Sequence, residues 1–275
     1  MKTIIVTGVT GSIGKAVAQA LAQRGNIHLI LAGRSAARLE ELQNELQGKT
    51  TKVDTLPLDL SDTVSVGRAV ETIKADYQAI DALVNIAAVY KAQKALSAQG
   101  HELMFATNHL GPFAFTTGLL PLLKATPGAK VLTVTAPSTT KIDFGNLNGE
   151  KKFSALTAFG ASKMMNLLFT FQLAKEFGSD KQVSMAFHPG LVKSDLMSDV
   201  PALFRGLLRL VSSLPQKAGA AIATLILNES AALQNGKFFN SNGKELKPTA
   251  LAQDAAVQQQ LWAASELLVR AGANR

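Results

Sequence analysis

Short apolar runs alternate with longer stretches of helical periodicity along most of this chain, and the alternation restricts the folds open to it. Val, Ile and Leu dominate the apolar runs, which are Ile4–Thr7, His28–Ala32, Lys52–Leu58, Ala82–Asn85, Lys130–Thr135 and Gln182–His188. Nearly continuous apolar strands are typical of sheets whose two faces are both covered. The repeated strand–helix–strand pattern therefore predicts an α/β protein with a doubly wound parallel sheet and helices on both faces.

The stretches between these runs have the spacing of amphipathic helices. Leu39, Leu42 and Leu46 recur at helical intervals after Ser35, which we interpret as a helix N-cap. Apolar residues recur in the same way after Ser61. We expect each of these helices to cross over from one parallel strand to the next.

Length and composition indicate the number of domains, the kinds of partner and the cellular location that we expect. Its 275 residues are 47% hydrophobic and no linker divides them, so we predict a single domain over residues 1–275. The absence of cysteine excludes disulfides, thiol catalysis and cysteine–metal sites, and we expect no metal site. The net charge of +8 is spread without a cluster, which indicates a solvated surface and no nucleic-acid partner. Because there is no signal peptide and no apolar stretch of roughly 18 residues, we expect a cytoplasmic protein without an integral membrane segment.

A glycine-rich turn follows the first apolar run and opens a helix. Gly8 permits the tight turn, Gly11 lets the backbone approach a pyrophosphate, and Gly14 allows the helix to pack against the strand. The free N–H groups of a helix N-terminus favour such an anion. We therefore predict a Rossmann-type dinucleotide site. The other residues of the predicted turn are Thr10, Ser12 and Ile13.

The second apolar run ends at Gly33-Arg34, where an NAD-binding domain would have an acidic residue for the ribose 2′-hydroxyl. An arginine suits a 2′-phosphate instead. We therefore predict NADP(H) in preference to NAD(H), bound by Arg34 with help from Ser35 and Lys15. The alternative is an ordinary surface arginine after a strand.

Further motifs follow the predicted strands and one predicted helix. They are Asp59-Leu60, Asn85-Ile86-Ala87-Ala88, Asn108-His109-Leu110-Gly111, and His188-Pro189-Gly190 with Val192 and Ser194 after it. Together with the glycine turn they resemble the short-chain dehydrogenase/reductase family over nearly the whole chain. Segments 146–151 and 236–239, with Trp262, are similar to its retinol-dehydrogenase-like branch. The glycine turn departs slightly, because most relatives have their second glycine where this chain has Ser12.

The resemblance implies a role for several of these residues. Asp59 would lie near the adenine, Asn108 would hold a proton-relay water, and the segment after His188 would bind the nicotinamide amide. Lys163 would hold the nicotinamide ribose. The remaining cofactor-binding residues that the resemblance implies are Leu60, Asn85, Ala87, Pro189, Gly190, Val192 and Ser194.

Two positions of the family's carbonyl chemistry are altered. The family uses a tyrosine four residues before a lysine, a spacing that puts both side chains on one helix face, and a serine after the fifth strand. Here the lysine is Lys163, but Phe159 stands at the tyrosine's position and Ala136 at the serine's. Ser138 would replace this serine only if the loop shifts. Loss of a general acid costs on the order of 10²–10⁴ in rate, so we do not expect ordinary ketone reduction.

Another group would then supply the proton. Tyr90 follows the fourth apolar run and would either face the nicotinamide or form a wall of the pocket. A water on Asn108 is a second route. We expect Tyr77 at the opposite end of the sheet, and structural roles for His109 and His188.

These observations favour an NADP(H)-dependent oxidoreductase that reduces a small hydrophobic or aromatic substrate through an altered proton path. A conjugated alkene or an iminium would tolerate the missing tyrosine better than a ketone. The alternatives are a non-redox enzyme on the same scaffold, such as a cyclase or isomerase, and a non-catalytic NADP(H) sensor or partner-binding protein. We also expect a substrate lid at about 194–217. The resemblance implies a homodimer or homotetramer paired through the helix from Ser154 to Phe177.

Overall fold

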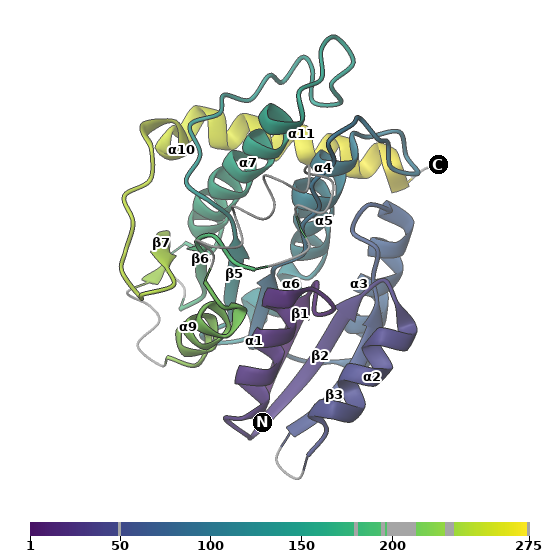
Figure 1. Cartoon of the computed structure of the whole chain (residues 1–275), viewed down its shortest axis with the longest axis vertical. Helices are drawn as coiled ribbons and strands as arrows, with labels where there is room; N and C mark the ends of the chain where they lie inside the picture. The colour runs from purple at the N-terminus through teal and green to yellow at the C-terminus, as the bar shows by residue number, and fades with distance from the viewer. Residues whose placement is uncertain (49–50, 179–180, 194–195, 197–212, 229–233, 274–275) are drawn as a thin grey trace.

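The computed structural model describes residues 1–48, 51–178, 181–193, 196, 213–228 and 234–273, and its centre is one parallel sheet (Figure 1). The sheet has seven strands in the order β3-β2-β1-β4-β5-β6-β7. The strands are β1 Lys2–Thr7, β2 Ile27–Gly33, β3 Thr51–Pro57, β4 Ala82–Asn85, β5 Lys130–Val134, β6 Val183–His188 and β7 Lys237–Asn240. Every neighbouring pair is parallel, which confirms the predicted α/β architecture.

All the strands that the sequence predicts are present, with ends within two residues of the prediction. β7 lies outside that prediction. It is four residues long, and it forms because Ala186 and Phe187 of β6 pair with Phe238 and Phe239. A strand this short depends on its neighbour in the sheet more than on its own sequence.

The helices cover both faces of the sheet. They are α1 Ser12–Ala22, α2 Ala36–Leu46, α3 Thr63–Asp76, α4 Leu103–Phe105, η1 Ala106–Leu110, α5 Gly111–Gly118, α6 Leu120–Ala125, α7 Ala155–Glu176, α9 Pro215–Leu227, α10 Ala250–Gln253 and α11 Ala255–Ala273. The Ser35 side chain accepts a hydrogen bond from the Arg38 N–H, which confirms it as the N-cap of α2. The N-cap of α3 is Asp62, one residue beyond Ser61.

Two hydrophobic cores lie on opposite faces of the sheet. Ile4 and Val6 of β1 join α1, α2 and α9 in one core, whereas Ile5 between them joins α3, α5 and α7 in the other. All three side chains are fully buried. Alternate residues of a strand point to opposite faces, so a strand apolar at every position is explained by a sheet covered on both sides.

The C-terminal helix α11 packs across α7 (Figure 1). Its Trp262 stacks on Phe169 of α7 with ring centroids 5.9 Å apart, and it meets Phe113 of α5 edge-on at 5.0 Å. Leu167 and Leu168 of α7 are at most 1% exposed in the single chain. These apolar side chains are therefore core residues, and the predicted pairing of subunits through α7 remains a prediction.

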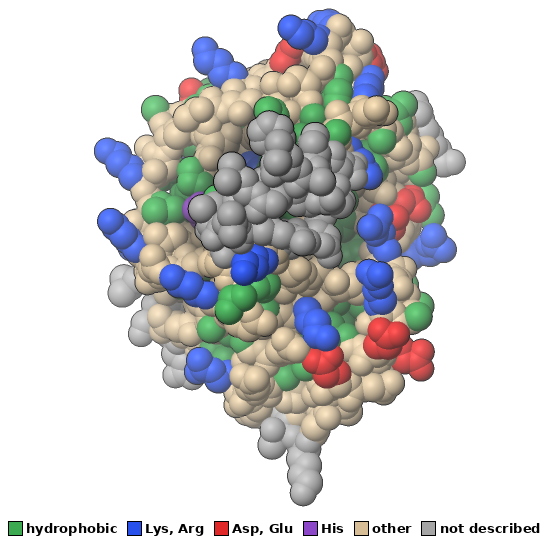
Figure 2. Space-filling view, viewed as in Figure 1, with side chains coloured by type: hydrophobic (Ala, Val, Ile, Leu, Met, Phe, Trp, Pro, Cys, Tyr) green, Lys and Arg blue, Asp and Glu red, His purple; other side chains and the backbone are tan. Residues whose placement is uncertain are grey.

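The predicted lid falls largely outside the described residues, which omit 194–195 and 197–212. At the end of the predicted range α9 begins at Pro215, where the fixed φ of proline suits the first turn of a helix, and the lid remains a prediction. Among the described helices, none combines the length and the hydropathy that crossing a membrane requires. Lys and Arg side chains are scattered over the face shown in Figure 2 without forming a single cluster.

Lys130 ties the start of β5 to the end of α9. Its side chain is buried, and its Nζ donates to the carbonyl oxygens of Leu225 at 3.3 Å and of Ile226 and Asn228 at 2.5 Å. The last carbonyls of a helix have no partner within the helix, and positive charge is favoured there. One ammonium group therefore satisfies several backbone acceptors at once.

We expect Lys130→Met to lower the free energy of unfolding by about 1–3 kcal/mol, because buried carbonyls lose their donor. Urea unfolding followed by circular dichroism measures the change. Lys181→Met is the control, since Lys181 is exposed just before β6, and it should change the free energy by less than about 0.5 kcal/mol. An unfolding midpoint for Lys130→Met equal to that of the wild type would contradict this role of Lys130.

Candidate active site

The predicted site residues gather outside the carboxyl ends of β1 and β4. β1 pairs with β2 on one side and with β4 on the other, so the strand order reverses at this point. Ligands of doubly wound sheets bind in the crevice at such a switch point. The glycine turn follows β1 and the loop with Tyr90 follows β4, so both line the same crevice.

The glycine turn and the β4 loop hold each other in place. The Thr7 hydroxyl accepts hydrogen bonds from the Ile86 N–H at 3.0 Å and the Ala87 N–H at 3.4 Å. Gly8 has a φ of +68°, and a Cβ there would lie 2.7 Å from the Ala87 Cα. A Cβ on Gly14 would overlap the carbonyl oxygen of Gly8. The turn is thus too close to its neighbours for a side chain at either glycine.

The start of α1 fits a pyrophosphate. Its N-cap is the exposed Gly11, which makes no side-chain capping hydrogen bond, so the first-turn N–H groups of the helix have no acceptor from the cap. Ser12 and Ile13 form this first turn, and Thr10 lies exposed beside it. Backbone donors at a helix N-terminus bind phosphate groups directly. The residues present therefore suit the dinucleotide that the sequence predicts.

Arg34 is the cation that the sequence predicts for a 2′-phosphate. It is exposed immediately after the last residue of β2. Lys15, its predicted helper, forms an ion pair with Glu45 at 2.7 Å, and the Ser35 hydroxyl caps α2. Asp59 accepts from the Ser61 N–H and hydroxyl and so shapes its own turn. The prediction that the site prefers NADP(H) therefore rests on Arg34 alone, because Lys15 is paired with Glu45.

Phe159 and Lys163 lie one turn apart on α7, at the centre of the candidate active site. The Lys163 Nζ is 5.1 Å from the centre of the Phe159 ring, a cation–π distance. Lys163 is 7% exposed, and this burial lowers its pKa to about 8. Within the described residues its ammonium group has no hydrogen bond, which leaves its donors for a ligand such as a ribose.

Tyr90 lies directly against Phe159. The two rings meet edge to face, with centroids 5.6 Å apart and planes at 78°. Tyr90 is 8% exposed, and its hydroxyl has no hydrogen-bond partner among the described residues. The structure therefore brings a phenol next to the helix position at which the sequence lacks one.

Asn108 holds the loop that carries Tyr90. It lies in η1, a short π-helix, and such insertions in helices are frequent at functional sites. Its Oδ1 accepts from the Val89 N–H at 2.7 Å, and its Nδ2 donates to the Val89 carbonyl at 2.9 Å and to the Ser162 hydroxyl at 3.1 Å. Ser162 in turn donates to the carbonyl of Phe159. Asn108 thus joins the residue before Tyr90 to α7.

Comparison with known proteins agrees with this geometry. The model of the family described as short chain dehydrogenase matches residues 2–202. This chain belongs to the short-chain dehydrogenase family. Human retinol dehydrogenase 12 is 34% identical, with 97% of this chain and 86% of the relative covered, and human retinol dehydrogenase 13 is 31% identical, with 98% and 84% covered. The chain is therefore similar to retinol dehydrogenases, which belong to the same oxidoreductase family.

Solved structures share the fold. A putative uncharacterized protein from Mycobacterium paratuberculosis has a TM-score of 0.80 at 27% identity, with 98% of this chain and 94% of that chain covered. A short-chain dehydrogenase from Burkholderia cenocepacia, solved in complex with NADP, has a TM-score of 0.72 at 19% identity, with 88% and 98% covered. The Rossmann-type fold predicted for this short-chain dehydrogenase is therefore confirmed.

Ser138 is the predicted substitute for the family's serine, and its hydroxyl is already hydrogen-bonded within the protein. Its hydroxyl donates to the Gly160 carbonyl at 2.8 Å and accepts from the Thr140 N–H at 3.2 Å. Ala136 lies two residues beyond the end of β5 and has no side-chain polar group. Ser138 therefore joins its loop to α7, and its proton is already directed at a carbonyl.

The other predicted cofactor residues differ in what they contact. The Asn85 Nδ2 donates to the Thr116 hydroxyl, while its buried Oδ1 has no partner among the described residues. The Pro189 carbonyl accepts from Ser241, and Gly190 has a φ of +76°. Leu60 is buried, and Ala87 and Val192 are half-buried. Ser194 lies outside the described residues.

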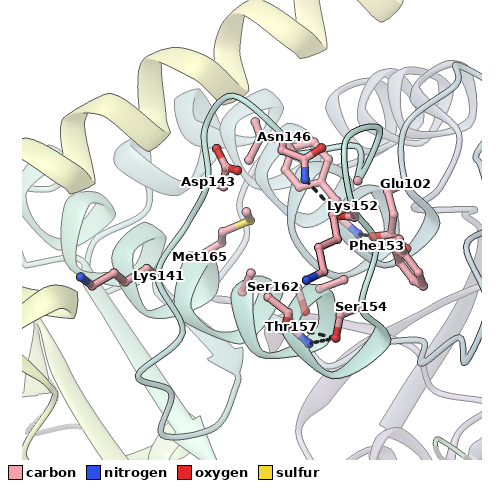
Figure 3. Close-up of a pocket in the computed structure, with 15 residues that line it drawn as sticks. Glu102, Lys141, Asp143, Asn146, Lys152, Phe153, Ser154, Thr157, Ser162 and Met165 are labelled. Atoms are coloured by element: carbon pink, nitrogen blue, oxygen red, sulfur yellow. Dashed lines mark hydrogen bonds between the residues drawn. The ribbon is translucent and has the colours of Figure 1, made fainter.

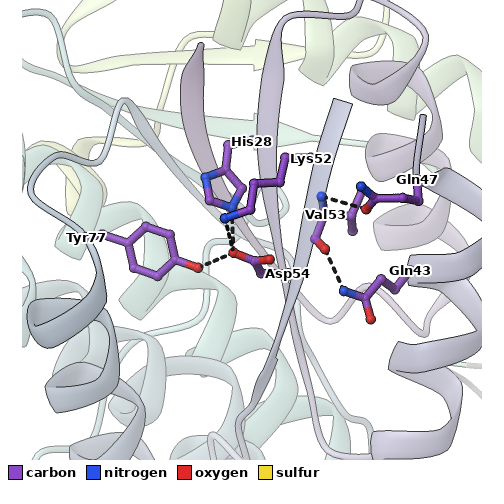
Figure 4. A network of polar contacts seen from close by, with 7 residues as sticks. All are labelled: His28, Gln43, Gln47, Lys52, Val53, Asp54 and Tyr77. Atoms are coloured by element: carbon purple, nitrogen blue, oxygen red, sulfur yellow. Dashed lines mark hydrogen bonds and ion pairs between the residues drawn. The ribbon is translucent and has the colours of Figure 1, made fainter. Parts of the chain in front are cut away.

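The remaining titratable candidates are structural, as expected. Tyr77 lies at the amino-terminal edge of the sheet, where its hydroxyl donates to Asp54 Oδ2 at 2.7 Å beside His28 (Figure 4). His109 is 1% exposed, its Nε2 lies 3.0 Å from the Ser265 hydroxyl, and burial lowers its pKa to about 4. Burial also lowers the pKa of His188.

The sequence did not single out two residues that organise the site. Thr7 ends β1 and joins the glycine turn to the β4 loop, and Ser162 links Asn108 to α7. Thr7 precedes Gly8 and Ser162 precedes Lys163. The sequence does not tell which distant residue either hydroxyl will bond. Their partners become visible only once the strands and helices are packed.

The buried ammonium of Lys163 makes the stability of the ligand-free protein depend on pH. Its pKa is about 8 in the folded chain against 10.5 as the ordinary value, so the unfolded chain binds more protons between these pH values. Stability therefore rises with pH across this window. We expect Lys163→Met to be more stable than the wild type at pH 7, by at most about 3 kcal/mol, and the difference to shrink toward pH 10.5.

Urea unfolding of both proteins at pH 7 and pH 10, without added nucleotide, measures this difference. Lys181→Met serves as the exposed-lysine control. A difference between Lys163→Met and wild type that is the same at both pH values would contradict burial of the charge.

Proposed function

We propose that this short-chain dehydrogenase is an NADP(H)-dependent reductase of a small hydrophobic substrate, and that its proton path does not use the family's tyrosine position. The observation that carries the proposal is the packing of Tyr90 on Phe159, beside the buried Lys163. The site contains the phenol of Tyr90, the amine of Lys163 and a cofactor cradle, by which we mean Gly8, Gly11, Gly14 and Arg34. What it lacks is a phenol on α7 itself.

The cradle residues support binding of a phosphorylated dinucleotide. Gly8, Gly11 and Gly14 let the backbone reach the pyrophosphate, and Arg34 offers a guanidinium at the end of β2. Lys163 would hold the nicotinamide ribose through its ammonium donors. A bound nicotinamide supplies or accepts the hydride, and the protein positions the substrate carbon for it.

The altered site favours substrates that need little help from an acid. A ketone builds negative charge on its oxygen and needs a donor there, whereas an iminium already carries the positive charge that hydride neutralises. A conjugated alkene accepts hydride at carbon and takes up its proton at the neighbouring carbon. Tyr90, or a water held near Asn108, would deliver that proton.

We expect Arg34→Ala to raise the Kd for NADPH about 10–100-fold, because a hydrogen bond from a charged group is worth about 1.5–3 kcal/mol. The Kd for NADH should stay the same, since NADH has no 2′-phosphate. Fluorescence titration with both nucleotides measures the two constants. Arg38→Ala, an exposed arginine on α2, is the matched control. An equal increase in Kd for both nucleotides in Arg34→Ala would contradict the assignment of a 2′-phosphate site.

We expect Tyr90→Phe to lower kcat for NADPH-dependent reduction by about 10²-fold or more, the usual cost of losing a general acid. Stopped assays of NADPH oxidation against conjugated enones, cyclic imines and ketones give kcat and KM. Tyr77→Phe removes the same hydroxyl at the far edge of the sheet and should leave kcat unchanged. Phe159→Tyr, which restores a phenol four residues before Lys163, should raise ketone reduction.

The same assays separate the remaining alternatives. Reduction that survives both Tyr90→Phe and Asn108→Ala rules out both named proton routes. NADPH binding without oxidation of any substrate favours a non-redox enzyme or a sensor. Absence of NADPH binding rules out the proposed function.

A further inference from the structure

A cavity of about 360 Å³ borders α7 beside the loop between β5 and α7 (Figure 3). Its walls come from the start of α4, the loop between β5 and α7, and one face of α7. That face carries Ala158, Ala161, Ser162 and Met165, whereas Phe159 and Lys163 do not line the cavity. Residues three and four apart share a helix face, so the two sets point in different directions from α7. Small-molecule pockets typically enclose about 300–1,000 Å³.

The loop that closes this cavity is held in shape by side-chain hydrogen bonds. Asn146 accepts from the Lys151 N–H at 3.0 Å and donates to the Lys152 carbonyl at 3.1 Å. Lys94, from the loop after β4, donates to the Gly149 carbonyl at 3.1 Å. The Asn148 Oδ1 accepts from the Glu102 N–H at 3.3 Å. The cavity is therefore part of the folded structure and does not need a ligand to form.

Its lining combines an apolar part with charged and neutral polar side chains. The apolar part consists of Phe105, Leu147, Phe153, Ala158, Ala161 and Met165. Both carboxylates are already engaged, because Glu102 accepts from the Met104 and Phe105 N–H groups and Asp143 accepts from the Gly145 N–H. Burial also raises the pKa of Glu102 above its ordinary value.

Lys152 is an exposed lysine whose ammonium group points into the cavity. Figure 3 shows its side chain reaching into the cavity toward Ser162 and Thr157, whereas Lys141 points away. Within the described residues, the Lys152 ammonium has neither an ion pair nor a hydrogen bond. The apolar part of the cavity, together with a cation that reaches into it, matches a molecule that has an apolar body and a single negative charge.

We propose that this cavity is a second ligand site, separate from the nicotinamide site, which binds a small apolar carboxylate with its carboxylate on Lys152. The ligand would contact Ser162, whose hydroxyl bridges Asn108 and the Phe159 carbonyl. The site does not depend on the proposed redox function, because its binding groups are distinct from Arg34, Tyr90 and Lys163.

The test uses 4-phenylbutyrate and its neutral counterpart 4-phenylbutan-1-ol, titrated calorimetrically into the whole chain with and without saturating NADPH. We expect the carboxylate to bind at least 10-fold more tightly than the alcohol. Lys152→Met should remove this preference, while Lys151→Met, at the neighbouring lysine that does not line the cavity, should keep it. Ala161→Leu should fill the cavity and abolish binding of both probes, and Ala37→Leu, on the exposed face of α2, should not.

Thermal melting of each variant shows that loss of binding is not loss of folding. The proposal is overturned if the carboxylate does not bind to the wild type, or if Lys152→Met binds it as tightly as the wild type. Complete displacement of 4-phenylbutyrate by NADPH would also overturn it, because the probe would then occupy the cofactor crevice. Binding in a protein that oxidises no NADPH would support the second site while the redox proposal fails.

Discussion

The contact between the turn after β1 and the loop after β4 is the constraint on which the site depends. The Thr7 hydroxyl accepts from two successive N–H groups of the β4 loop, and Gly8 leaves no room for a Cβ against Ala87. Because β1 and β4 meet where the strand order reverses, this contact shapes the crevice that a dinucleotide needs. The same loop then leads directly to Tyr90, so one junction positions both the cofactor cradle and the candidate proton donor.

The surroundings of Phe159 on α7 are ordered by hydrogen bonds from two other elements of the fold. Phe159 occupies its helix position without a hydroxyl, yet Asn108 still joins Val89 to α7 through Ser162. Lys163 remains buried beside the ring, with its charge disfavoured by desolvation. The scaffold therefore holds the phenol of Tyr90, from another element, against Phe159.

The two faces of α7 have different environments. One face carries Phe159 and Lys163 beside Tyr90, and another lines a partly open cavity with the loop that follows β5. Between them, α11 covers the middle of the helix through Trp262 and Phe169. Ser162 is the residue common to the wall of that cavity and the Asn108 network.

The sequence by itself determined the features that depend on residues close together in the chain. Strand–helix alternation predicted the parallel sheet, the glycine spacing predicted the turn, and Phe159 four residues before Lys163 marked the altered site. The tertiary structure decided which distant residues meet: Tyr90 against Phe159, Asn108 against Ser162, and β7 beside β6. Local periodicity reflects burial of each element, whereas these contacts depend on how elements pack, which no short stretch of sequence encodes.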